Sequence, residues 1–326
     1  MFRFSNDWKA VLPLILVLML VTAGCTAGNT PGQPTDTTPI RIAVLPIVEG
    51  LPLYAAQDNG FFEKQSVKVE FIPAGSAAER DQLIAAGQAD GMINDLLAVA
   101  LFNRQAPQLQ VVQFAHVSAP GAPLYVIVAS PQSGIKASKE LAGVEIGISQ
   151  GSIIDYATNR ILAGEGLTAD QVKTVAVPKI PDRMALLLSG QLKAATLPQP
   201  FATIAILQGA VAIVDDTKYP DVGNSVVSFR KKFIDEHPQA VRGFIEALNQ
   251  ATSAVNANPE KYRGLLGKYK VVAEQMLAAY PIPKFPAASL PTPRQFEDVV
   301  AFALERKLLQ APVQYADSVN PSFIKK

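Results

Sequence analysis

The chain contains few residues of the kinds that form covalent cross-links, metal sites or strongly charged surfaces. Its 326 residues include one cysteine and two histidines, and 17% are charged. One cysteine cannot make an internal disulfide or a cysteine-rich zinc site, and two histidines cannot fill a multi-histidine metal site. The net charge of +1 gives no general attraction to nucleic acid, and none is expected as a partner. At 49% hydrophobic, the chain is too apolar to be disordered.

Common catalytic and nucleotide-binding motifs are also missing. The sequence contains no Walker A motif, no G-x-G-x-x-G and no H-E-x-x-H. These absences argue against an enzyme and against a bound cofactor, and we expect neither. An enzyme with the fold that is inferred below is a distant alternative. A third class is an extracellular adhesion or scaffold lipoprotein, which would have no polar-lined cleft.

The N-terminus is typical of an export signal. Residues 10–24 carry no charge and include an aliphatic block over 12–20, which is shorter than the roughly 20 residues of a membrane-spanning helix. The block ends in Thr-Ala-Gly-Cys at 22–25, which resembles a bacterial lipobox. We therefore predict a signal peptide over 1–24, a lipid (palmitate) on Cys25, and a flexible tether over 25–39. The alternative is an uncleaved anchor with an incidental cysteine.

After the tether, strand and helix patterns alternate. Short apolar runs predict strands over 40–45, 67–72 and 89–93. Helical patterns follow them, over 51–58, 77–87 and 95–104, and Ser76 with Glu79 forms a capping box before the second. Alternation of this kind predicts an α/β fold with a mainly parallel sheet.

The same pattern returns about 100 residues later. ALLLSGQLKAATLP, beginning at Ala185, resembles QLIAAGQADGMIND, beginning at Gln82, and Gly87 aligns with Gly190 at an offset of 103. We predict two related lobes, over 40–124 and 125–224. Strands over 124–129 and 225–229 are expected to cross between them as a hinge. The segment 225–326 is then the return strand and a helical tail packing mainly on lobe 1.

Loops that follow the strands are the expected ligand site. In open α/β sheets, ligands lie outside the carboxyl ends of the strands, so two facing lobes bring such loops to one cleft. For several of these side chains, core packing or helix capping is the open alternative, Tyr54, Ser76 and Asp95 above all. The candidate ligand-binding residues are Glu49, Tyr54, Ser76, Asn94, Asp95, Gln150, Gly151, Ser152, Asp155, Tyr156, Gln199 and Phe201.

Three segments carry a resemblance to a known family: YAAQDNGFFEK at 54–64, Gly-Ser at 75–76 and GQAD at 87–90. They resemble the corresponding segments in the solute-binding proteins of ABC importers. The similarity is to the group that binds nitrate, sulfonates, taurine and thiamine pyrimidines. It implies a two-lobed, type II-like periplasmic-binding-protein fold, and a monomer that delivers cargo to a permease and its ATPase. With the lipid on Cys25, it implies a location outside the cytoplasm, anchored to the cell membrane.

The cargo is inferred from the chemistry of the loops. None of them contains Arg or Lys, although Arg80 lies just beyond one, and they are rich in carboxylates, amides and aromatic rings. Such a set favours a neutral, planar, hydrogen-bonding heterocycle. Riboflavin is the leading candidate, which implies vitamin uptake. The alternatives are a thiamine-pyrimidine precursor, or a sulfonate, taurine or nitrate.

Overall fold

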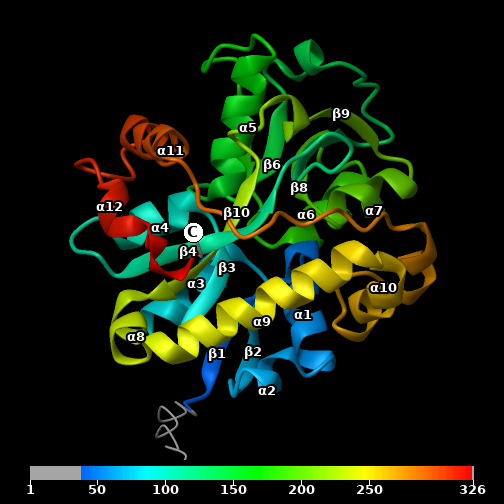
Figure 1. The fold of residues 1–326 in the computed structure, drawn as a ribbon. Coiled ribbons are helices and arrows are strands. Elements are labelled where there is room, and N and C mark those ends of the chain that lie inside the picture. The colour runs from blue at the N-terminus through cyan, green and yellow to red at the C-terminus, as the bar shows by residue number, and fades with distance from the viewer. Residues whose placement is uncertain (1–37, 325–326) are drawn as a thin grey trace, which may run out of the picture. The chain divides into compact units, whose positions relative to one another are not determined.

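The computed structural model describes residues 38–324, which form two lobes, each built on a five-stranded sheet flanked by helices (Figure 1). The predicted signal peptide and Cys25 lie outside the described residues. Within 38–324, no helix is both long enough and apolar enough to cross a membrane.

The sheet of lobe 1 has the strand order β2-β1-β3-β10-β4. The first three strands are parallel, and β10 runs antiparallel to both β3 and β4. The strands are β1 (Ile40–Val44), β2 (Val69–Pro73), β3 (Gly91–Asn94), β4 (Leu109–Val117) and β10 (Asn224–Arg230). The predicted α/β class is confirmed, and β10 shows that the chain returns to lobe 1 after building lobe 2.

The sheet of lobe 2 repeats this arrangement, with the order β7-β6-β8-β5-β9. Here β6, β7 and β8 are parallel, and β5 runs antiparallel to β8 and β9. The strands are β5 (Tyr125–Ala129), β6 (Glu145–Ile148), β7 (Lys173–Ala176), β8 (Ala194–Pro198) and β9 (Val211–Asp215). In each sheet, therefore, three neighbouring strands are parallel, and an antiparallel strand and then a fifth strand extend the sheet on one side.

The helices of both lobes connect the parallel strands. Lobe 1 carries α1 (Leu51–Asp58), α2 (Phe61–Lys64), α3 (Ala77–Ala85) and α4 (Leu96–Phe102); lobe 2 carries α5 (Ile153–Gly164), α6 (Ile180–Leu188) and α7 (Phe201–Leu207). Both α3 and α6 end just before a glycine with positive φ, +68° at Gly87 and +80° at Gly190. Because a residue with a Cβ rarely adopts this conformation, the matched glycines found in the sequence mark matching helix ends.

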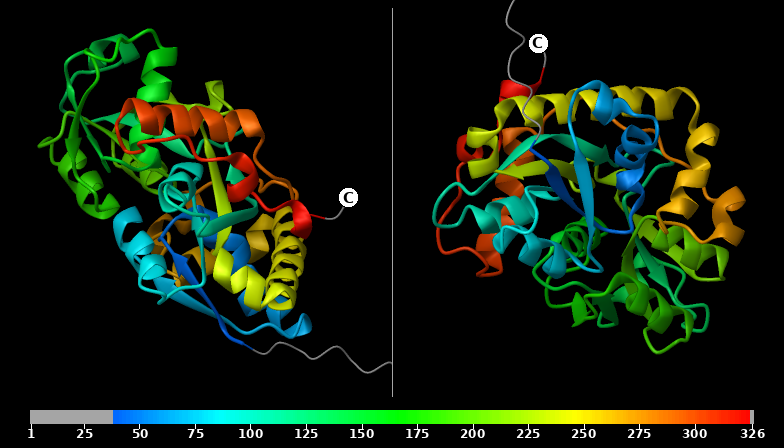
Figure 2. Two further views of the ribbon diagram at one scale, coloured as in Figure 1. Left: turned by 90° about the vertical axis from the view of Figure 1, so that its left-hand side faces the viewer. Right: turned by 90° about the horizontal axis from the view of Figure 1, so that it is seen from below.

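The chain crosses between the lobes at 118–124 and again at 216–223. The two strands expected at the crossings do form, as β5 and β10, but each belongs to the sheet of the lobe that the chain is entering. The crossings themselves are short segments directly before these strands. Figure 2 shows the two lobes in two further orientations.

The tail after β10 contacts both lobes. It comprises α8 (Lys231–Glu236), α9 (Pro238–Ala257), α10 (Pro259–Lys268), α11 (Pro293–Glu305) and α12 (Tyr315–Ser318). The long helix α9 packs on α1 and α2 of lobe 1, where Phe244 stacks on Phe62 with ring centroids 5.3 Å apart. Helix α11 packs on α4, and its Asp298 accepts a 2.6 Å hydrogen bond from Tyr156 of lobe 2.

Candidate functional site

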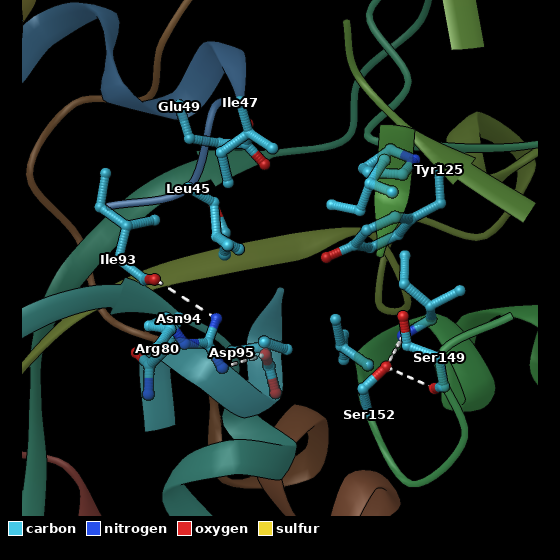
Figure 3. Close-up of a pocket in the computed structure, with 16 residues that line it drawn as sticks. Leu45, Ile47, Glu49, Arg80, Ile93, Asn94, Asp95, Tyr125, Ser149 and Ser152 are labelled. Carbon is cyan, nitrogen blue, oxygen red and sulfur yellow. Dashed lines mark hydrogen bonds and ion pairs between the residues drawn. The ribbon is translucent and has the colours of Figure 1, made fainter. Parts of the chain in front are cut away.

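Two adjoining cavities lie where the lobes face each other. Counted together with the open space at their mouths, they measure about 490 and about 520 Å³. We call them the inner cavity, which reaches Glu49 and Tyr125, and the outer cavity, which is bordered by Ser76 and Gln150. They share five lining residues, Ala77, Arg80, Asp95, Ser149 and Ser152. Figure 3 shows the inner cavity with side chains of lobe 1 on one side and Tyr125, Ser149 and Ser152 of lobe 2 on the other.

Lobe 1 gives the inner cavity three buried polar atoms that have no hydrogen-bond partner within residues 38–324. They are Glu49 Oε2, Asn94 Nδ2 and Ser225 Oγ, and each residue is at most 4% exposed. Asn94 is held in place through its other end, since Ser228 donates a 2.8 Å hydrogen bond to Asn94 Oδ1. Buried polar atoms are nearly always paired in folded proteins, so three unpaired ones around one cavity point to a ligand or to ordered water.

Glu49 lies in a short 3₁₀ helix (Val48–Gly50) that follows β1. The pKa of its carboxyl group is raised to about 8, chiefly because the charged form loses its hydration on burial, with a smaller contribution from the negative charge of nearby Asp216. Glu49 is therefore mostly protonated at pH 7. In that state it can donate a hydrogen bond and adds no negative charge to the cavity.

Arg80, in the first turns of α3, lines both cavities and is 3% exposed. Its guanidinium contacts Asp81 at 2.8 Å and Asp95 at 3.5 Å, and it donates to the carbonyl of Ile93. Burial acts to lower its pKa, but the two carboxylates outweigh burial and the pKa is raised. The inference of a neutral cargo depended on loops that contain no Arg or Lys. Arg80 lies just beyond such a loop, and it brings a cation to the cavity from within a helix.

Lobe 2 lines the inner cavity with one aromatic ring, two hydroxyl groups and the first turn of α5. Tyr125 is 4% exposed, at the start of β5. Ser152 caps α5 by accepting from the Ile154 N–H, and it donates to the Ser149 carbonyl at 2.7 Å. Ile153, the first residue of α5, also borders the cavity, as Ala77 of α3 does from lobe 1. Helix starts carry amide N–H groups outside the helical ladder, which can bind an acceptor.

Seven of the twelve candidate residues border the two cavities. Glu49, Asn94, Asp95 and Ser152 line the inner one, and Ser76, Gln150 and Gly151 line the outer one. Three of them also cap helices: Ser76 Oγ accepts from Glu79 N–H, Asp95 Oδ1 accepts from Ala98 N–H, and Ser152 caps α5.

Three aromatic candidates lie outside both cavities. Tyr54 stacks on Tyr269 within lobe 1, with ring centroids 4.0 Å apart. Tyr156 is fully buried and donates to Asp298, and Phe201 packs into the apolar cluster of lobe 2. Each sits on a helix that follows a cleft loop, with its ring turned toward the core of the protein.

Asp155 and Gln199 also lie outside the cavities. Their side chains accept hydrogen bonds from the backbone beside them instead. Asp155 Oδ2 accepts from the Gly151 N–H at 3.0 Å, which holds the loop before α5. Gln199 Oε1 accepts from the Thr203 N–H at 3.3 Å, in the first turn of α7. Both bonds stabilise cleft loops without presenting the side chain to a ligand.

Sequence reasoning missed Arg80, Tyr125 and Ser225 as cavity-lining candidates. Tyr125 and Ser225 belong to β5 and β10, the strands that follow the two crossings. Because each crossing passes the cleft, a polar residue next to a crossing was the signal in the sequence that could have identified Tyr125 and Ser225.

These features define a two-lobed periplasmic-binding-protein fold with a cleft between the lobes. A ligand-binding component of an ABC-type import system from Staphylococcus aureus superposes with a TM-score of 0.74, over 88% of this chain and 97% of its own, at 16% identity. The alkanesulfonate-binding protein of Xanthomonas axonopodis pv. citri, solved with bound MOPS, has a TM-score of 0.72, at 18% identity, over 87% and 98% of the two chains.

The family is given by sequence comparison. Residues 48–262 match the model of the NMT1/THI5-like family, and the chain belongs to that family. A protein of Bacillus subtilis (strain 168), provisionally named an aliphatic sulfonates-binding protein, is 24% identical over 330 residues, covering 98% of this chain and 96% of its own length.

Proposed function

We propose that this chain is the solute-binding component of an ABC importer. It captures a small organic solute between its lobes, outside the cytoplasm, and delivers it as a monomer to a permease driven by an ATPase. The fold supports this role, because the cleft is bordered by both lobes and the chain crosses between them in short segments that can act as hinges. The Staphylococcus aureus structure is a ligand-binding component of an ABC-type import system, and the Bacillus subtilis relative is provisionally named for binding aliphatic sulfonates.

The observation that carries the proposal is the set of unpaired atoms on Glu49, Asn94 and Ser225. Leaving a buried polar group unpaired costs about 1–3 kcal/mol, so three around one cavity form a surface suited to a ligand that satisfies them. The rest of the lining is largely aliphatic. Its aliphatic members are Leu45, Ile47, Ala77, Ile93, Ile153, Ile154, Ile180 and Pro198.

For the cargo, we favour an organic anion with an aliphatic body, a sulfonate above all. Protonated Glu49, the Asn94 amide and the Ser225 hydroxyl can each donate a hydrogen bond, and a sulfonate offers three acceptor oxygens. The aliphatic lining suits an alkyl chain. Riboflavin is less well matched, because Tyr125 is the one aromatic residue lining the inner cavity and a flavin presents a three-ring system.

A thiamine-pyrimidine precursor is the second candidate, and Tyr125 with Asp95 favours it. One tyrosine face can stack on a single heterocycle, and a carboxylate can accept from an amino group on the ring. Asp95 is already engaged by Arg80 and by the α4 backbone, which weakens this alternative.

A ligand panel separates these cargoes. The purified full chain is screened by thermal shift and calorimetry with butanesulfonate, taurine, nitrate, an aminopyrimidine and riboflavin. We expect butanesulfonate to stabilise the fold by about 2.7 kcal/mol at a concentration of 100 Kd. Binding of a heterocycle without binding of any sulfonate would contradict the cargo and leave the importer role intact. Binding of nothing in the panel would count against both.

We also propose that a lipid on Cys25 anchors the protein to the cell membrane. Changing Cys25→Ser should move the protein from the membrane fraction to the soluble fraction of cells that process lipoproteins, because no thiol remains to be acylated. Thr26→Ser, next to it, is the matched control and should stay with the membrane. Retention of the Cys25→Ser protein in membranes would show that another segment holds it there.

A further inference from the structure

Arg183, in the middle of α6, is a fully buried cation that has no counter-charge among the residues described by the structure. Its Nη1 donates to Ser149 Oγ at 3.2 Å, whereas Nε and Nη2 have no partner among residues 38–324. Burial lowers the pKa of its guanidinium to about 10, and no neighbouring carboxylate opposes that effect. A buried charge that lacks a partner is costly, so this side chain needs an explanation in terms of what balances it.

The position of Arg183 connects it to the cleft. Ser149, its hydrogen-bond partner, lines both cavities, and Ile180 of the same helix lines the inner one. The guanidinium therefore lies directly behind the wall that lobe 2 presents to the ligand. Ser149 Oγ in turn donates to the carbonyl of Pro178 at 3.1 Å, so its oxygen faces the cation while its hydrogen points elsewhere.

The other charged groups of the inner cavity have partners or carry little charge. Arg80 has Asp81 and Asp95 as ion-pair partners, and Glu49 is mostly protonated at pH 7. Among the described side chains at this cleft, Arg183 is the cation that has no ion-pair partner. Because a low-dielectric interior screens charge poorly, an anion entering the cavity would feel it strongly.

We propose that Arg183 determines the charge specificity of the cleft and acts through Ser149. When an anionic ligand oxygen arrives, the Ser149 hydroxyl turns its hydrogen from the Pro178 carbonyl to that oxygen, while Arg183 continues to donate to Ser149 Oγ. The cation thus strengthens the serine as a donor and balances the ligand's charge without touching it. The inference rests on the proposed binding function and adds that lobe 2 helps to hold the anionic head, through the Ser149 hydroxyl and the cation behind it.

The test compares two ligands of nearly the same shape, butanesulfonate and the uncharged butanesulfonamide, on the full chain. We expect the wild-type protein to prefer the sulfonate, and Arg183→Met to lose about tenfold or more in sulfonate affinity, the worth of a hydrogen bond to a charged group. Affinity for the sulfonamide should change much less. Arg183→Lys keeps the charge and should keep part of the preference.

The variant Ser149→Ala tests whether Arg183 acts on the ligand through Ser149. It should weaken sulfonate binding to a similar extent, and the double variant should be little worse than either single one, because both act on one interaction. Arg104→Met, on the exposed surface of lobe 1, removes the same charge elsewhere and should change neither affinity.

The stability of the ligand-free Arg183→Met variant distinguishes a role in ligand specificity from a role in supporting the fold. Because Arg183→Met removes an unpaired buried cation, the ligand-free variant should unfold at the same or a higher temperature than the wild type. Equal loss of affinity for both ligands, or a marked fall in stability, would show that Arg183 only supports the fold. A cleft that binds neutral solutes and no anion would overturn the inference while leaving the importer role standing.

Discussion

Replacing Asp216 with alanine should lower the free energy of unfolding by about 3 kcal/mol, because at least two buried N–H groups lose their acceptor. The Asp216 side chain is fully buried after β9. Its Oδ1 accepts from Ser118 Oγ at 2.9 Å and from the Leu124 N–H at 3.1 Å, and Oδ2 accepts from the Tyr125 N–H at 3.1 Å. Urea unfolding of the full chain, followed by circular dichroism, measures the change.

The effect is expected to be large because Asp216 joins the two crossings between the lobes. Ser118 and Leu124 belong to the first crossing, and Asp216 begins the second. Gly223, at the end of the second, packs so closely that a Cβ there would clash with the Asp216 carboxylate. One side chain thus orders both hinge segments, and its loss should loosen the lobes relative to each other.

Two variants control this prediction. Asp216→Asn keeps the shape and one acceptor oxygen, so it should fall between alanine and the wild type. Asp215→Ala removes the neighbouring carboxylate, which caps a 3₁₀ turn by accepting from Thr217, and should cost about 1 kcal/mol. Equal losses at the two positions would mean that Asp216 has no special part in the hinge.

The pH dependence of stability gives a second measure of the same group. Burial raises the pKa of Asp216 to about 7, from an ordinary value of 3.8. The folded state therefore holds this proton more tightly than the unfolded state, and the free energy of unfolding should decrease as the pH rises from about 4 to about 7. Asp216→Asn cannot titrate, so its stability should fall less across that window.

Local sequence signals were sufficient to predict the skeleton of each lobe. The capping box at Ser76 and the glycines at 87 and 190 mark helix ends that the structure contains, and the 103-residue offset between the glycines corresponds to two sheets with the same strand order. These features depend on the backbone conformation of a few adjacent residues. The places of β10 between β3 and β4, and of β5 between β8 and β9, depend on contacts across the whole chain, and no local pattern predicts them.

The candidate site was predictable where it depends on strand ends. Glu49 and Ser152 follow parallel strands and Asn94 ends one, and topology alone brings such positions to the cleft. Arg80 reaches it from inside a helix, and Arg183 lies behind its wall in another helix, so their positions depend on helix packing and side-chain length. The rings of Tyr54 and Tyr156 show the converse, because the rotation of a helix about its axis decides whether a residue faces the ligand or the core.

Glu49 should control the second large effect, which is on binding. If the protonated carboxyl group donates to the head of an anionic cargo, Glu49→Ala should weaken butanesulfonate binding by about tenfold to a hundredfold, the worth of a hydrogen bond to a charged group. Glu49→Gln keeps an uncharged donor and should lose much less. Calorimetric titration of the full chain at pH 7 compares the variants, with Glu145→Gln on the exposed start of β6 as the matched control.

The sign of the pH dependence follows from the same carboxyl group. Above pH 8 Glu49 ionises, so its donor disappears and a negative charge forms beside the anionic ligand. Sulfonate affinity should therefore fall as the pH rises through 8 in the wild type and stay nearly level in Glu49→Gln. Asp216 titrates nearby, and Tyr54, Tyr125 and Tyr280 also sense the charge of Glu49, so the glutamine variant isolates its part.

The pH profile also distinguishes the two candidate cargoes. An aminopyrimidine donates through its amino group and gains an acceptor when Glu49 ionises, so its affinity should rise over the same range in which sulfonate affinity falls. Arg183 remains positively charged to about pH 10 and contributes nothing to a change centred at 8. A wild-type profile for butanesulfonate that is flat from pH 7 to 9 would place the anionic head away from Glu49, on the side of Ser149 alone.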